Sequence, residues 1–126
     1  MITPDTDQLT IALAQITPVW LQREATLARM VAWVDRAAAE GAQLVAFSEG
    51  VLPGYPFWVE HTDGARFESP RQKRLFAHYV EQAVDVDAGH LAPLCAAAAR
   101  HGVWIVCGII ERDSARGQSL FASMVT

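Results

Sequence analysis

One carboxylate in this sequence stands where many enzymes keep a proton-transferring group. Glu49 follows the apolar run Leu44–Phe47 and a single serine, and a loop rich in glycine and proline comes after it. A glutamate at the carboxyl end of a buried strand can act as a general base, because α/β folds bind ligands at that edge. The loop also carries Tyr55, Phe57 and Trp58, which could wall a small substrate. The alternatives are a cap or salt bridge for the carboxylate and simple packing for the rings.

The other reactive side chains fit such chemistry less well. Cys95 lies in an alanine-rich helical stretch and Cys107 in the middle of an apolar run, so both are expected to be reduced and packed. A thiol buried among apolar groups has a raised pKa and is a poor nucleophile. The one lysine, Lys73, lies among arginines at a predicted helix start, which favours a solvated surface. The histidines are too far apart for a local metal motif, and we expect no metal site.

A strand–helix–strand unit is predicted to position Glu49. Residues 10–16 carry apolar side chains on both alternating faces, which indicates a buried strand. Over residues 23–40 apolar side chains recur at steps of three and four, which predicts a helix, and Gly41 suits its C′ position. A strand at 43–47 completes a βαβ unit, in which the two strands are expected to be parallel.

A second helix is predicted after a charged excursion without periodicity over residues 59–68. Ser69, Pro70 and Gln72 form an N-cap, a first-turn proline and a capping-box glutamine. Its apolar side chains are spaced so that one stripe should be buried. That stripe comprises Leu75, Phe76, Tyr79, Val80 and Ala83.

The rest of the sequence adds one more helix and two strands. Asp85 and Asp87 interrupt the second helix, and a third is expected over residues 88–101. An apolar strand is predicted over 103–110 and an antiparallel partner over 119–125. The helices can cover one face of such a sheet, although its strands are apolar on both faces. We therefore expect residues 1–126 to be the first part of a larger fold, whose remainder covers the second face.

Composition excludes several classes of function. Hydrophobic residues make up 52% of the chain and the net charge is −4, so nothing favours binding to nucleic acid or to an anionic membrane. Residues 1–8 predict a loose lead-in without the basic region of a signal peptide. No run approaches transmembrane length. These features, with two packed thiols, predict a cytoplasmic protein.

The stretch Phe-Ser-Glu-Gly-Val-Leu-Pro-Gly-Tyr-Pro at residues 47–56 resembles the first catalytic motif of the nitrilase, or carbon–nitrogen hydrolase, superfamily. The opening strand with Ala-Gln-Ile-Thr-Pro and the later Gly-Val-Trp-Ile-Val-Cys-Gly-Ile-Ile-Glu-Arg also resemble that family, so the likeness runs from Leu9 onward. The Leu-Pro-Gly-Tyr-Pro segment is most similar to the nitrile-hydrolysing branch. Ser48 departs from the pattern, since members often have proline there.

The resemblance implies an α/β fold, the N-terminal portion of an α-β-β-α sandwich with a mixed sheet and helices on one face. It implies a Glu–Lys–Cys triad that needs no cofactor, in which Glu49 is the general base and a cysteine forms a thioimidate with a nitrile. Tyr55, Phe57 and Trp58 would contact the nitrile or amide substrate. The lysine and cysteine would lie beyond this chain, which is therefore expected to be inactive alone. A homo-oligomer is expected for the full-length form.

Three alternatives stay open at this point. The chain could belong to an amidase or carbamoyl-hydrolase of the same superfamily. It could also be an inactive, truncated module that docks onto other proteins. A nucleotide-binding Rossmann domain fits poorly, because no glycine-rich phosphate loop follows the first strand.

Overall fold

The computed structural model describes residues 8–64 and 66–126, which form a mixed sheet with helices against it. The strands lie in chain order; the first three are parallel, and the fourth runs antiparallel to the third. The predicted βαβ unit and antiparallel partner strand are therefore confirmed. Of the predicted lead-in, residues 1–7 lie outside the described residues. The strands are β1 (Ile11–Ala14), β2 (Leu44–Phe47), β3 (Trp104–Arg112) and β4 (Leu120–Val125).

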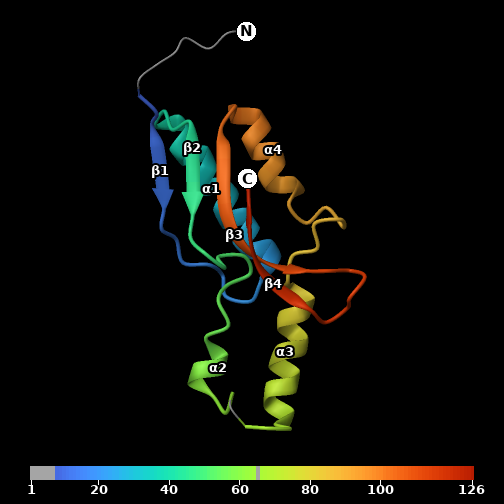
Figure 1. Cartoon of the computed structure of the whole chain (residues 1–126). Helices are drawn as coiled ribbons and strands as arrows, with labels where there is room; N and C mark the ends of the chain where they lie inside the picture. Colours follow the sequence, from blue (N-terminus) through green and yellow to red (C-terminus); the bar gives the residue numbers. More distant parts are fainter. Residues whose placement is uncertain (1–7, 65) are drawn as a thin grey trace.

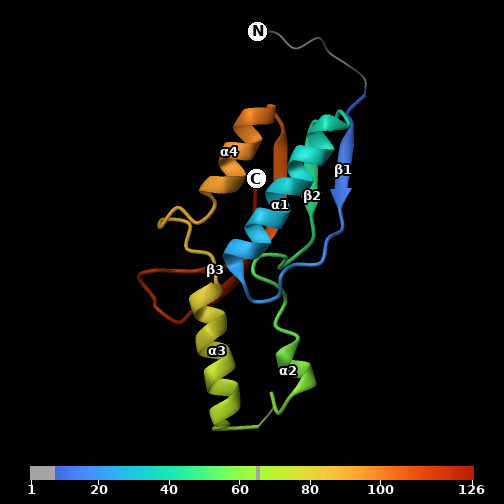
Figure 2. The ribbon, with the colours of Figure 1, turned by 180° about the vertical axis from the view of Figure 1, so that it is seen from behind.

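Two helices, α1 (Arg23–Ala39) and α4 (Ala92–His101), cover one face of the sheet (Figure 1, Figure 2). The main core lies between these helices and the strands, as expected for an amphipathic stripe facing a sheet. The longest apolar run of the sequence, β3, supplies the centre of this core. The buried residues of this core include Leu27, Met30 and Val34 of α1, Leu94 and Ala97 of α4, and Val45, Ile105, Cys107 and Ile109 of the strands.

The end of α1 confirms the role predicted for Gly41. Its backbone is left-handed, with φ of 89°, and its N–H donates to the Ala38 carbonyl at 3.0 Å. The Ala42 N–H donates to the Ala37 carbonyl at 3.0 Å, which completes a Schellman motif. The chain is thereby turned directly into β2, the strand that leads to Glu49.

The opposite face of the sheet is uncovered in the part of the chain that the structure describes. Leu13, Trp104 and Met124 are 81%, 70% and 74% exposed. They alternate with residues that point toward the main core, which are buried in β3 and partly buried in β1 and β4, so these strands are apolar on both faces but covered on one. We call this surface the bare face. It confirms that helices cover only one side of the described sheet.

Helices α2 (Trp58–His61) and α3 (Pro70–Gln82) extend past the end of the sheet as an arm (Figure 1). Ser69 caps α3 as predicted, since its hydroxyl accepts from the Gln72 N–H at 3.3 Å. The glutamine side chain does not close a capping box; it donates instead to Asp63 Oδ1 at 2.9 Å. The predicted burial of the α3 stripe is confirmed at Tyr79 and at Ala83, which follows the helix; Leu75 and Val80 are half-buried, and the prediction was wrong for Phe76. Within α3 only Tyr79 is buried, and Phe76 is exposed, because the arm has no layer to pack on beyond α2.

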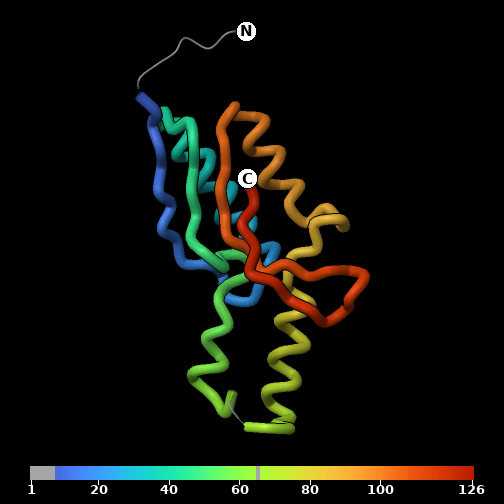
Figure 3. Tube along the Cα trace, viewed as in Figure 1, coloured from blue at the N-terminus to red at the C-terminus, as the bar shows by residue number. Residues whose placement is uncertain are grey.

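Several other boundaries differ from the prediction. The strand predicted over residues 10–16 ends at Ala14, and the excursion predicted over residues 59–68 begins within the short helix α2. The third predicted helix begins at Ala92 rather than at residue 88, because Asp85 Oδ1 accepts from the Ala88 N–H at 2.9 Å and holds a turn there. Strand β3 runs on to Arg112, two residues beyond its predicted end. The turn between β3 and β4 extends sideways from the sheet (Figure 3). Within the described residues, no helix is both long and apolar enough to cross a bilayer.

Candidate active site

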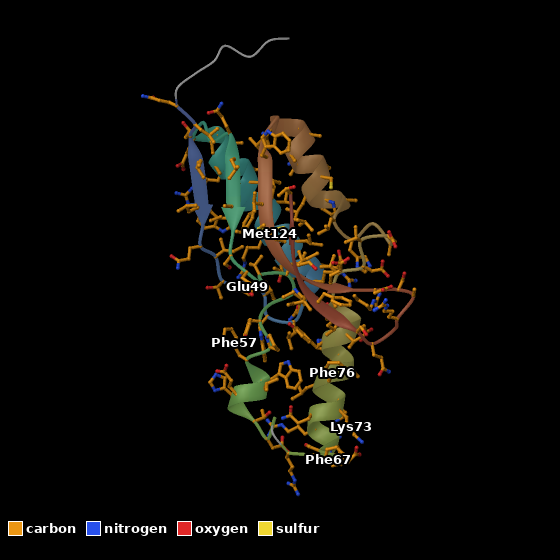
Figure 4. All side chains as sticks on the ribbon, viewed as in Figure 1. Glu49, Phe57, Phe67, Lys73, Phe76 and Met124 are labelled. Carbon is orange, nitrogen blue, oxygen red and sulfur yellow. The ribbon has the colours of Figure 1, made fainter. Side chains whose placement is uncertain are left out.

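Glu49 lies in a turn two residues past the end of β2 and is exposed. Glu49 lines a hollow of about 310 Å³. Figure 4 views the bare face and shows Glu49 at the lower end of β2, with Met124 of β4 above it. The strand-end position predicted for this carboxylate is thus observed, and the carboxylate is accessible to a small molecule. The hollow is lined by Phe47, Glu49, Val106, Gly108, Ala122, Ser123 and Met124.

The backbone of Glu49 is fixed by its close approach to Gly108. A Cβ added at Gly108 would lie 2.5 Å from Glu49 Cα and 2.6 Å from the Gly50 nitrogen, closer than real contacts allow. The Gly108 N–H donates to the Ser48 carbonyl at 3.3 Å, and the Ile110 N–H donates to the Leu52 carbonyl at 2.8 Å. Strand β3 therefore continues to pair with the Glu49 turn after β2 has ended, and only glycine fits at the crossing point.

The predicted aromatic residues divide into two kinds. The Tyr55 and Phe57 rings are 47% and 48% exposed and contact each other, with centroids 5.2 Å apart. The Tyr55 ring also lies beside Gly50, since its Cδ2 would be 3.7 Å from a Cβ there. Trp58 is 7% exposed and packs edge-on against Tyr79, with centroids 6.2 Å apart. Neither exposed ring lines the hollow itself; they lie on the loop that leaves it.

The structure keeps both cysteines away from Glu49. Cys107 points into the main core, and burial raises the pKa of its thiol to about 11, as expected for an inert thiol. Cys95 was predicted to be packed but is exposed, because it lines an apolar hollow of about 480 Å³ between α4 and β3 that is open to solvent. Both belong to the side of the sheet that α4 covers, whereas Glu49 opens on the bare face.

Lys73 lies on the arm, toward the outer end of α3 and far from Glu49 (Figure 4). Its ammonium pairs with the Glu68 carboxylate. The lysine and its neighbouring arginines are exposed, as the sequence predicted for a solvated helix start. Among the described residues, no group of three or more His, Cys, Asp or Glu side chains could hold a metal ion.

Sequence reasoning missed Gly108 and Met124 as members of the Glu49 hollow. A signal for Gly108 was present, because a glycine inside an otherwise apolar strand often marks a close backbone approach. Met124 had no such signal. Its place in the hollow depends on the register of β4 against β3, in which it pairs with Gly108.

The sequence matches the carbon-nitrogen hydrolase family over residues 10–126. The chain belongs to this family. The likeness predicted from the Glu49 motif is therefore confirmed, and the sheet with helices on one face is the corresponding part of the fold.

Named relatives of this carbon–nitrogen hydrolase chain are nitrilases. It is 36% identical to an arylacetonitrilase of Aspergillus niger over 92% of the chain and 32% of the relative. It is 32% identical to an aliphatic nitrilase of Rhodococcus rhodochrous, over 95% of the chain and 31% of the relative. The chain thus spans about a third of the length of the curated relatives it matches.

A solved structure agrees with the fold of this carbon–nitrogen hydrolase chain. It is a double mutant of the amidase from Nesterenkonia sp. AN1 in complex with acrylamide, with a TM-score of 0.55 and 24% identity. The match covers 90% of the present chain and 36% of the amidase. At this level of identity the match supports the α/β fold and not the substrate.

Proposed function

We propose that residues 1–126 form the first part of a nitrilase-type hydrolase and that Glu49 is its general base. In this reaction Glu49 takes the proton of a cysteine thiol supplied by the rest of the enzyme. The sulfur bonds to the nitrile carbon as one carbon–nitrogen π bond breaks, and the nitrogen takes up the proton. Water then adds to the resulting thioimidate, ammonia leaves, and a second water releases the carboxylic acid. The reaction is accelerated because one difficult addition is split into easier steps beside a positioned base.

The observation that carries the proposal is the fixed position of Glu49. Its carboxylate is accessible in a hollow of about 310 Å³, while its backbone is pinned against Gly108. A base must be held in place to be effective, since a misplacement of about 1 Å can cost a factor of ~100 in rate. The names of the relatives favour nitriles over amides as substrates, because the relatives at 32% and 36% identity are nitrilases.

The test compares variants of the gene's full-length product. Glu49→Gln keeps the size of the side chain but cannot take a proton, so ammonia release from aryl and aliphatic nitriles should fall about 10²- to 10⁴-fold. Glu49→Asp keeps the carboxylate and should fall less. The matched control is Glu40→Gln, at an exposed glutamate that pairs with Arg36 at the end of α1. If Glu49→Gln retains full activity, Glu49 is not the base.

Parallel assays with amides decide between the proposed substrate class and the alternative. A nitrilase releases ammonia from a nitrile faster than from the corresponding amide, whereas an amidase shows the reverse order. The 126-residue chain alone should release none from either, because Lys73 and both cysteines lie away from the Glu49 hollow. A full-length product that is inactive on both classes would favour the interaction module.

A further inference from the structure

The loop that connects Glu49 to the exposed aromatic pair is held at three successive carbonyl groups. The Pro53 carbonyl accepts from the Leu21 N–H at 2.9 Å. The Gly54 carbonyl accepts from the Tyr79 hydroxyl at 3.2 Å, and the Tyr55 carbonyl accepts from Trp20 Nε1 at 2.7 Å. The donors come from the segment before α1 and from α3, so two distant parts of the chain hydrogen-bond to one short loop. We call these three bonds the latch.

Packing at Gly54 shows how closely Trp20 is fitted to the loop. A Cβ added there would lie 2.8 Å from Trp20 Cδ1, so the indole ring lies against the glycine. The backbone of Gly54 has a φ of +123°, a conformation that other residues rarely adopt. Two independent reasons therefore require glycine at this point.

Leu21 carries the strain of the latch. Its φ of +54° places a bulky residue in the left-handed region, which persists only where the surroundings enforce it. Its side chain is buried, its N–H donates to Pro53, and its carbonyl accepts from His78 Nε2 at 3.0 Å. Strain of this kind in a segment that connects a strand to a helix is a reason to look for a positional role.

The latch acts on the aromatic pair directly. The Tyr55 carbonyl that Trp20 binds also accepts from the Phe57 N–H at 2.8 Å, so one oxygen fixes the turn that carries both rings. Tyr79 holds the other side, because its ring packs against Trp58 while its hydroxyl reaches Gly54. Burial raises the pKa of Tyr79, so the hydroxyl keeps its proton and remains a donor at neutral pH.

We propose that Trp20 and Tyr79 are positioning residues that fix Tyr55 and Phe57 relative to Glu49 and thereby set substrate selectivity. The inference rests on the proposed function. Neither residue touches the Glu49 hollow, so neither is a catalytic residue. The latch governs which nitriles fit beside the aromatic pair, while Glu49 governs the chemistry.

The test uses Trp20→Phe and Tyr79→Phe in the gene's full-length product, each of which removes one donor and keeps an aromatic ring. The first readout is the ratio of kcat/KM for a bulky aryl nitrile to kcat/KM for a small aliphatic nitrile. Losing one hydrogen bond should change this ratio about two- to tenfold. The control is Trp33→Phe, a partly exposed indole on α1 beside Arg36, which should leave the ratio unchanged.

The second readout is amide hydrogen exchange of the peptide that covers residues 52–57, which does not depend on activity. Faster exchange there in Trp20→Phe or Tyr79→Phe, with unchanged exchange in α4, supports the positioning role. Equal losses for both nitriles with an unchanged ratio would overturn the claim of selectivity, and unchanged exchange would overturn the latch. If the wild type hydrolyses neither nitriles nor amides, the proposed function fails, and exchange alone still decides whether Trp20 and Tyr79 hold the loop.

Discussion

The face of the sheet under α1 and α4 and the bare face that carries the Glu49 hollow are built from the same strands with opposite outcomes. On the covered face, Val45, Cys107 and Ile109 are almost completely buried. On the bare face, Trp104 of the same strand β3 and Leu13 of β1, the strand beside β2, are mostly exposed. The difference lies in the layers above the sheet and not in the residues.

This comparison separates stability from function. Side chains of the covered face stabilise the described fold, because their burial removes apolar surface from water. Side chains of the bare face gain nothing comparable in this chain, yet they surround the Glu49 carboxylate, which we propose as the general base. A layer that covered the bare face would also close the Glu49 hollow, which agrees with the proposal that this chain is part of a longer enzyme.

The largest expected effect contrasts one leucine from each face. Leu27→Ala empties a fully packed site under α1 and should lower the free energy of unfolding by about 2–5 kcal/mol. Leu13→Ala removes the same atoms from an exposed site and should change it by less than about 0.5 kcal/mol. Urea denaturation of the 126-residue chain measures both. Similar losses for the two variants would mean that the bare face is covered in solution.

The next largest effect is expected at Gly108, where β3 passes the Glu49 turn. Gly108→Ala places a methyl group against the backbone of Glu49 and pushes the two segments apart, which should destabilise the chain by about 1–3 kcal/mol. In the full-length product it should also lower kcat, because the carboxylate moves with its backbone.

Gly117→Ala is the control for that variant. Gly117 also has a left-handed backbone, with φ of +65°, but no atom lies within 4 Å of an added Cβ. It should destabilise the chain by about 1 kcal/mol through its backbone alone and leave kcat unchanged. If both variants lower kcat equally, contact with Glu49 is not the reason.

The extent of successful prediction follows the same division between faces. Local signals identified Gly41 at the end of α1 and Ser69 at the start of α3, because capping depends on neighbouring residues only. Periodicity identified α1 and the strands, since burial under a layer leaves a pattern. Family resemblance predicted the family correctly and singled out Glu49 as a candidate base, a role that composition alone could not distinguish from that of a cap.

Long-range packing set the limits of prediction. The apolar stripe of α3 predicts burial, yet the arm leaves Phe76 exposed because what a helix packs on cannot be read from its own pattern. Cys95 shows the same limit, since its alanine-rich surroundings suggest packing while the helix presents it to an open hollow. The close approach at Gly108 could be predicted only by knowing which strand passes the Glu49 turn.

A third prediction concerns association through the bare face. Leu13→Ser combined with Met124→Ser should leave the free energy of unfolding nearly unchanged but reduce self-association of the 126-residue chain, because contiguous exposed apolar surface drives contact between copies. Sedimentation velocity over a range of concentrations measures this. Phe67→Ser is the control, at an exposed ring on the arm (Figure 4). Equal reductions in the control and the double variant would assign association to the arm.

The smallest expected effect lies on the outer surface of the covered side, where α1 meets α4. Asp35 Oδ1 accepts from Arg100 Nη2 at 2.6 Å and pairs with His101 Nε2 at 2.7 Å. The hydrogen bond from Arg100, followed by that from His101, lowers the pKa of the Asp35 carboxyl. The native chain therefore holds fewer protons than the unfolded chain between the two pKa values, so this contribution is present above about pH 4 and is lost as the pH falls further.

Asp35→Asn should accordingly lower Tm slightly at pH 7 and by less at pH 2.5, because protonation of the wild-type carboxyl removes this contribution progressively as the pH falls below about 4. The difference should be small because all three side chains are partly exposed and water screens the pair. Asp113→Asn, in the exposed β3–β4 turn with Arg116 as its only ion-pair partner among the described residues, should show a smaller difference between the two pH values. A Tm loss for Asp35→Asn that is as large as that of Leu27→Ala would mean that surface ion pairs, and not burial, hold the helix layer on the sheet.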